Sequence, residues 1–135
     1  MTRNIGLWID HREAVIIFHE QGGQRTEIVE SNLEKPAKQA GGSRSSTPWG
    51  PQDIASDKKR DRKFHHQLDQ YYNEVIGHLS GADSLYIFGP GEAKNELRKH
   101  LLNTHILRDR IAEVETADKM TRPQIAAKVR DFFPE

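Results

Sequence analysis

The fold is decided by residues 5–30, which read IGLWIDHREAVIIFHEQGGQRTEIVE. Two runs rich in β-branched and aromatic residues, Ile5–Ile9 and Ala14–Phe18, are separated by a short polar turn, which is typical of paired strands. The paired glycines Gly22-Gly23 supply the positive φ angles that a tight hairpin needs, and Arg25–Glu30 alternates polar and apolar residues. This stretch therefore predicts an antiparallel meander of three strands.

Downstream of the meander, helical patterns alternate with strands. Apolar residues recur at helical spacing between Phe64 and Leu79, and a capping box with proline, Thr121 to Gln124, opens a last helix. The expected elements are a helix over 58–79, a strand over 84–88, a helix over 92–103, a strand over 110–116 and a helix over 121–133. Strands that alternate with helices pair in parallel. We therefore predict one α/β domain of βββαβαβα order, an RNase H-like order, with a mixed five-stranded sheet and three helices.

Length and composition agree with one small domain. The chain has 135 residues, a common domain size, and its net charge is zero. It contains no cysteine, which excludes disulfides and thiolate metal sites. The N-terminus carries no signal-like apolar region and no run approaches about 18 apolar residues, so we expect a soluble, cytoplasmic protein without a membrane partner.

Residues 31–57 are rich in Asn, Ser, Gly, Pro and Lys, and we expect them to form a flexible loop. Between Lys35 and Lys63 there are eight basic residues against three acidic ones, a net charge of +5. Basic side chains on such a segment can bind RNA phosphates, and Trp49 can stack on an unpaired base. The candidate RNA-binding residues are Lys35, Lys38, Arg44, Trp49, Lys58, Lys59, Arg60, Arg62 and Lys63.

Three polar residues of the first helix form a second candidate site. His65 and Asp69 are four residues apart, and His66 and Asp69 are three apart, so each pair can share a helix face. Such a face suits a metal or acid–base site, or a solvated surface. Because no third ligand is evident in the sequence, we expect an exposed polar face and no bound metal.

Two stretches carry a family resemblance. One is Leu7–Ala14, and the other is Phe88–Leu97, which contains the pattern GPGxxKxxL with Gly89, Pro90, Gly91 and Lys94. Together with the basic loop and helix between them, they resemble the middle domain of archaeal and eukaryotic class 1 release factors and of Pelota. The chain is more similar still to a group of small bacterial proteins labelled "translational machinery protein", in which Val114–Asp118 and the final helix also match.

The GPG turn itself has two interpretations. It opens a helix N-terminus after a strand, where free backbone amides can bind an anion. Glu92 follows directly and its charge opposes an anion, so we expect the glycines to serve tight strand-to-helix packing instead. Lys94 then faces either solvent or RNA.

The resemblance implies a Gly-Gly-Gln tip on the loop after the third strand, whose glutamine helps release the nascent peptide in the release factors. This chain departs from that pattern, because the corresponding loop has Ser43 after Gly41-Gly42. The sequence Gly22-Gly23-Gln24 occurs between the second and third strands, where we interpret it as a hairpin turn. We therefore expect no peptidyl-tRNA hydrolysis.

The preferred hypothesis is a non-catalytic or accessory translation factor that binds the ribosome or tRNA-like RNA and needs no cofactor. Two alternatives stay open. A metal-dependent, RNase H-like nuclease would use carboxylates at one sheet edge, where parallel strands end; the candidates are Asp10, Glu92, Glu115 and Asp118. A protein-interaction module would pair through an exposed strand at the edge of the sheet. The sequence does not indicate an oligomeric state.

Overall fold

A computed structural model describes residues 3–20, 22–33, 50–104 and 107–133; from 50 to 61 the description covers the backbone. The described elements are β1 (Asn4–Ile9), β2 (Glu13–Glu20), β3 (Gly23–Glu30), α2 (Gly50–Gly77), β4 (Ser84–Gly89), α3 (Ala93–Leu102), the short 3₁₀ turn η1 (Arg108–Arg110), β5 (Ile111–Thr116) and α4 (Arg122–Phe132). This order confirms the predicted βββαβαβα arrangement.

The strands form one mixed sheet in the order β3-β2-β1-β4-β5. β1 pairs antiparallel with β2, and β2 pairs antiparallel with β3, which is the predicted meander. β1 pairs parallel with β4, and β4 pairs parallel with β5. The strands joined through helices are thus the parallel ones, as expected for crossover connections.

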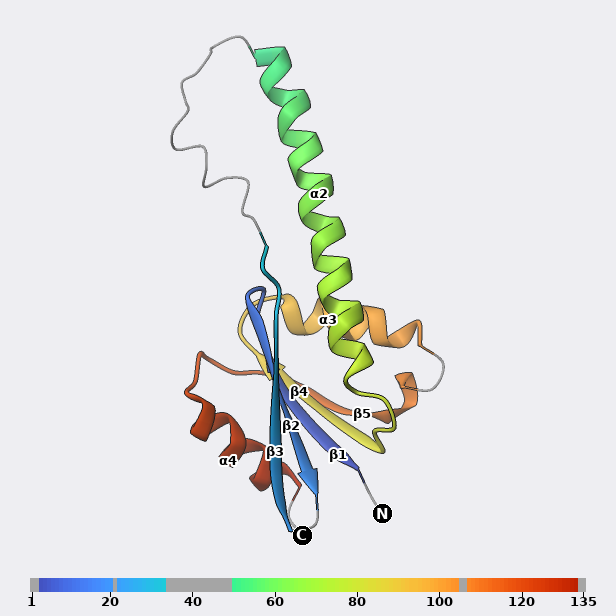
Figure 1. Cartoon of the computed structure of the whole chain (residues 1–135), viewed down its shortest axis with the longest axis vertical. Coiled ribbons are helices and arrows are strands. Elements are labelled where there is room, and N and C mark those ends of the chain that lie inside the picture. Colours follow the sequence, from blue (N-terminus) through green and yellow to red (C-terminus); the bar gives the residue numbers. More distant parts are fainter. Residues whose placement is uncertain (1–2, 21, 34–49, 105–106, 134–135) are drawn as a thin grey trace.

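Helices cover both faces of the sheet. Figure 1 shows α2 and α3 on one side and α4 on the other. The predicted apolar face of α2 packs into the larger core through buried Leu68, Tyr71, Tyr72, Val75 and Leu79. On the opposite face, Ile125, Val129 and Phe133 of the C-terminal segment pack against Trp8, Val15, Ile17, Tyr86 and Phe88.

Close backbone approach fixes α4 on its face of the sheet. A Cβ at Gly6 of β1 would lie 2.4 Å from Cγ2 of Val129, so only glycine lets the helix come this near. The predicted capping box is present, because Thr121 accepts from the Gln124 backbone amide and Gln124 accepts from the Thr121 amide in return. These two reciprocal hydrogen bonds fix the residue at which α4 begins.

The largest difference from the prediction is the start of α2. We expected the helix from residue 58, but it begins at Gly50, so residues 50–57 of the predicted loop are helical. Pro51 is compatible with this start, because the first turn of a helix needs no amide donor from it. Residues 34–49 of the predicted loop lie outside the described residues.

α2 is the longest element and reaches well beyond the sheet. Its C-terminal half packs on the sheet and on α3, while its N-terminal half extends away from the rest of the molecule (Figure 1). No helix within the described ranges combines the length and the apolar character needed to cross a bilayer.

Candidate functional site

The carboxyl ends of β1 and β4 meet in very close contact. Gly89 has φ +152°, and a Cβ there would lie 2.2 Å from the carbonyl oxygen of Ile9. A side chain at this position is therefore excluded by backbone atoms rather than by a movable neighbour. Gly91 also has positive φ, at +65°, and lets the chain turn into α3. The expectation that these glycines serve tight packing agrees with this geometry.

Lys94 belongs to the turn and not to the surface. The side chain is 5% exposed, and its ammonium donates to the carbonyl oxygen of Gly91. The expectation that Lys94 faces solvent or RNA is therefore wrong, because an exposed role would require an accessible ammonium group. In this chain the lysine closes the turn that the two glycines make possible.

A polar cluster joins α2, α3 and the β1–β2 turn beside this edge. Oε1 of Glu96 accepts from the Tyr72 hydroxyl at 2.5 Å and contacts Nε2 of His11 at 3.0 Å. Burial, together with the hydrogen bond to Glu96, raises the pKa of Tyr72 far above its ordinary value. The tyrosine therefore stays protonated and acts as a fixed donor, which holds the carboxylate in one orientation.

A neighbouring tyrosine fixes the same helix to the turn. The Tyr71 hydroxyl donates to the carbonyl oxygen of Asp10 at 2.9 Å. Its pKa is also raised, mainly by burial and secondarily by the charge of Asp10. Two adjacent tyrosines of α2 thus reach two different partners at the carboxyl edge of the sheet.

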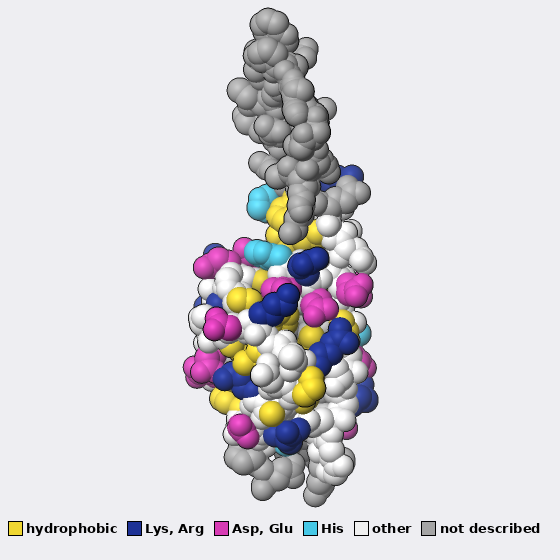
Figure 2. Space-filling view, turned by 90° about the vertical axis from the view of Figure 1, so that its left-hand side faces the viewer, with side chains coloured by type: hydrophobic (Ala, Val, Ile, Leu, Met, Phe, Trp, Pro, Cys, Tyr) yellow, Lys and Arg dark blue, Asp and Glu magenta, His cyan; other side chains and the backbone are white. Residues whose placement is uncertain are grey.

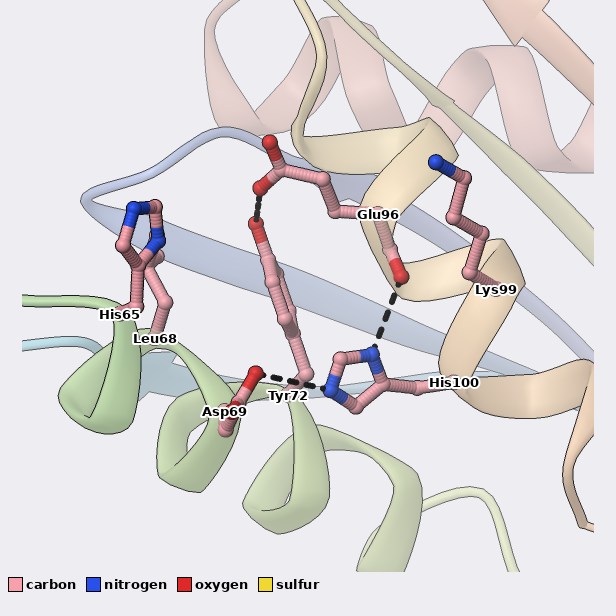
Figure 3. A pocket seen from close by; sticks show the side chains of 7 residues that line it. All are labelled: His65, Leu68, Asp69, Tyr72, Glu96, Lys99 and His100. Carbon is pink, nitrogen blue, oxygen red and sulfur yellow. Dashed lines mark hydrogen bonds and ion pairs between the residues drawn. The ribbon is translucent and has the colours of Figure 1, made fainter. Parts of the chain in front are cut away.

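A pocket of about 230 Å³ opens between α2 and α3 next to this cluster. It is lined by His65, Leu68, Asp69, Tyr72, Glu96, Lys99 and His100 (Figure 3). Nε2 of His100 contacts Oδ1 of Asp69 at 3.2 Å, and its Nδ1 lies 3.2 Å from the backbone carbonyl oxygen of Glu96. The polar lining is therefore positioned by contacts between the two helices.

The residues at 65, 66 and 69 divide between two roles. His65 and Asp69 line the pocket, and Asp69 pairs with His100, a partner from α3 that the spacing within α2 could not indicate. His66 is exposed and is not part of the pocket lining. The polar face that we expected to be exposed is therefore divided: His65 and Asp69 form a wall of the pocket, and His66 faces solvent.

The carboxylates named for the nuclease alternative do not converge on one point, and three of them bind neighbouring groups of the protein. Asp10 accepts from the backbone amides of Arg12 and Glu13 at 2.8 and 2.9 Å, which closes the β1–β2 turn. Glu92 accepts from the Asn95 side chain at 3.1 Å. Glu115 faces α4, where it accepts from the Tyr86 hydroxyl and lies 3.5 Å from Lys128.

Asp118 completes this set without creating a metal site. It is exposed, and its backbone carbonyl accepts from the indole of Trp8 at 3.3 Å. Among the residues that the structure describes, no group of three or more His, Cys, Asp or Glu side chains is placed to hold a metal ion. The acidic edge therefore lacks the converging carboxylates that two-metal phosphodiester hydrolysis requires.

The candidate RNA-binding residues divide along the chain. Lys35, Lys38, Arg44 and Trp49 lie outside the described residues. Lys58, Lys59 and Arg60 lie on the part of α2 that extends away from the sheet, followed by the exposed Arg62 and Lys63. Figure 2 shows, by contrast, that Lys and Arg are interspersed with Asp and Glu on the described part of the face that carries α4.

Gln24 occupies a structural position next to α4. Its side-chain amide donates to the carbonyl oxygen of Ala126 at 3.0 Å and accepts from Arg130 at 3.1 Å. β2 ends at Glu20 and β3 begins at Gly23, with φ +94° at Gly22 and +153° at Gly23. The interpretation of Gly22-Gly23-Gln24 as a hairpin turn is confirmed.

The fold of this chain is similar to parts of several solved structures. The archaeal translation termination factor aRF1 matches with a TM-score of 0.63 and 12% identity, over 94% of this chain and 33% of that chain. The chain has the fold of one third of aRF1. The Pelota protein of Thermoplasma acidophilum matches with a TM-score of 0.58 and 15% identity, over 98% of this chain and 33% of that chain.

A further structure, described as an archaeal protein, matches with a TM-score of 0.53 and 12% identity, again over 33% of its length. This chain therefore spans about a third of the aRF1, Pelota and archaeal chains that it matches. No family model matches the chain, and no curated protein matches its sequence. The likeness to aRF1 and Pelota is one of fold.

Three residues of the polar cluster, Tyr72, Glu96 and His11, were not singled out from the sequence. Tyr72 fell within the apolar pattern between Phe64 and Leu79, and His11 and Glu96 fell within the two family-like stretches without a role. These residues lie 61 and 24 positions from Tyr72, so only the packing of α2 against α3 and the turn brings them together. A weak signal was present, because a tyrosine on a buried helix face needs a polar partner for its hydroxyl.

Proposed function

We propose that this chain is a non-catalytic, accessory translation factor that binds the ribosome or tRNA-like RNA through residues 35–63. The observation that carries the proposal is the fold, which matches the translation termination factor aRF1 over 94% of this chain and Pelota over 98%. The mixed charge of the α4 side gives no comparable reason to place an RNA contact there (Figure 2).

The position of α2 supports the choice of this segment. The helix begins at Gly50, so the basic run from Lys58 to Lys63 lies on a helix that extends beyond the sheet (Figure 1). A protruding basic helix can approach a phosphate backbone without bringing the acidic side chains of the sheet edge close to it.

Salt-dependent co-sedimentation with ribosomes tests this proposal. Each neutralised phosphate releases counterions, so binding should weaken steeply as salt rises. Changing Lys58, Lys59, Arg60, Arg62 and Lys63 to Ala should weaken binding and flatten the salt dependence. Trp49→Ala should weaken binding to a single-stranded RNA by about 5- to 150-fold, which corresponds to the loss of one stacked base, and should leave binding to a duplex unchanged.

A control variant removes the same number of charges elsewhere. Arg12, Arg98, Arg108, Arg110 and Lys119 are exposed, and changing all five to Ala should leave co-sedimentation close to wild type. Ribosome association that survives the substitutions at 58–63 and at Trp49 would contradict the proposed contact. A protein-interaction role would then be favoured, because β3 is an edge strand with one unpaired side in the described sheet.

A further inference from the structure

The pocket between α2 and α3 has the size of a site for one ring system. Its volume of about 230 Å³ is below the roughly 300–1,000 Å³ of sites that enclose drug-sized ligands. Leu68 and Tyr72 are buried and form its apolar part, and polar side chains from both helices surround them (Figure 3). An aromatic ring with polar edges fits this combination better than an aliphatic chain or a small ion does.

The fixed polar groups of the pocket are acceptors. Oε1 of Glu96 already accepts from the Tyr72 hydroxyl and contacts His11, while its other oxygen, Oε2, accepts no hydrogen bond from a described residue. Asp69 shares one oxygen with His100, and its side chain is 61% exposed. Two carboxylates with open oxygens can accept N–H groups from a ligand.

The pocket also contains an imidazole ring, from His65, and an ammonium group, from Lys99. His65 is exposed on the α2 wall, and Lys99 is exposed on the α3 wall. An imidazole ring can stack on a planar base, and an ammonium group can pair with a phosphate. Arg62, His65 and Asp69 are spaced to share one face of α2, which makes the pocket continuous with the basic run of that helix.

We propose that this pocket binds a single unpaired RNA nucleobase that carries an exocyclic amino group. The base stacks on His65 and donates its amino hydrogens to Oε2 of Glu96 or to Asp69, while Lys99 pairs with a flanking phosphate. The proposal rests on the RNA-binding function above and adds a base-selective site to it. A free phosphate alone does not fit, because two carboxylates line the same pocket.

Titration of the full chain with AMP, CMP, GMP and UMP, followed by amide chemical shifts, tests the site. The three nucleotides with amino groups should shift the amides of Leu68, Tyr72 and His100. UMP has no exocyclic amino group and offers one ring N3–H between two carbonyl oxygens, which the carboxylates repel, so it should bind at least about fivefold more weakly.

The variant Glu96→Gln gives a sharper readout than loss of binding. Its side-chain oxygen still accepts from Tyr72 and His11, so the amide NH₂ takes the place of Oε2 and presents donors to the pocket. The preference over UMP should therefore be lost, because the amide NH₂ can donate to the carbonyl oxygens of uracil as well as to the ring nitrogens of the other bases. His65→Ala should weaken binding of the amino-bearing nucleotides about tenfold, and His65→Phe should restore it through stacking.

His66→Ala is the matched control, because His66 is exposed on the same helix and does not line the pocket. Equal binding of UMP and AMP, or equal effects of His65→Ala and His66→Ala, would overturn the base site. Ribosome binding that depends on residues 58–63 would then still support the proposed function. Conversely, selective binding of AMP by a chain that fails to sediment with ribosomes would leave the base site and remove the ribosomal role.

Discussion

At the scale of single residues, two glycines and a lysine shape the edge beside the candidate site. Gly89 permits β4 to touch the backbone of β1, and Gly91 permits the turn that Lys94 closes. The packing role of the glycines could be predicted from the sequence, because a glycine between a buried strand and a helix commonly marks a close backbone approach. The position of Lys94 could not, because the same spacing is compatible with an exposed or a buried ammonium group.

The substitution Gly89→Ala should destabilise the protein by at least about 2 kcal/mol, because the new Cβ would meet the Ile9 carbonyl oxygen at 2.2 Å. Urea unfolding followed by circular dichroism measures this change. Gly77→Ala is the control, because nothing lies within 4 Å of a Cβ there and its φ is not positive. It should be neutral or stabilising by up to about 1 kcal/mol, and equal losses in the two variants would refute the close-approach argument.

At the scale of elements, sequence patterns predicted almost every strand and helix. The predicted apolar face of α2 is the one that is buried, because helical periodicity reports burial directly. The start of α2 was predicted eight residues late, since residues 50–57 carry turn-forming residues and little apolar periodicity. His65 and Asp69 could be recognised as one polar helix face, but the pocket could not be predicted, because its other wall comes from α3 and the placement of the two helices is set by the whole core.

The contact between α4 and β5 should be sensitive to acid. The hydrogen bond from Tyr86, followed by the positive charge of Lys128, lowers the pKa of Glu115 below its ordinary value. A carboxyl whose pKa is lowered in the folded state contributes stability above its unfolded pKa and loses it as pH falls through the folded value. Glu115→Gln should therefore be less stable than wild type at pH 7, and this difference should shrink below about pH 4.5.

Urea unfolding midpoints at several pH values between about 3 and 7 measure this effect. Glu113→Gln is the control, because Glu113 is an exposed acidic residue of the same strand. It should differ little from wild type at any pH. A difference between wild type and Glu115→Gln that persists unchanged to pH 3 would contradict the assigned shift.

At the scale of the whole molecule, the chain shares its fold with a third of aRF1 and of Pelota, but its Gly-Gly-Gln sequence serves the hairpin. We predict that the wild-type protein does not release a model peptide from stalled ribosomes. Gln24→Ala should remove two hydrogen bonds to α4 and lower stability by about 1–2 kcal/mol without changing peptide release.

A peptide-release assay and a thermal melt of the same two proteins check both parts of this prediction. Gln124→Ala is a suitable control for the melt, because it also removes a side-chain hydrogen bond at α4, within the capping box. If the wild-type protein released the peptide and Gln24→Ala reduced that release, the hairpin glutamine would be reactive. This result would contradict the structural role that its hydrogen bond to Ala126 indicates.

The length of α2 beyond the sheet has a geometrical consequence. The part from Gly50 to Leu68, the first buried side chain described in the helix, spans about 27 Å at 1.5 Å per residue. A tilt of the helix axis by about 10° at Leu68 would therefore displace its first residue by roughly 5 Å, close to the rise of one helical turn. The direction of the basic run at 58–63 therefore depends on the contacts that Tyr71 and Tyr72 make at the sheet end of the helix.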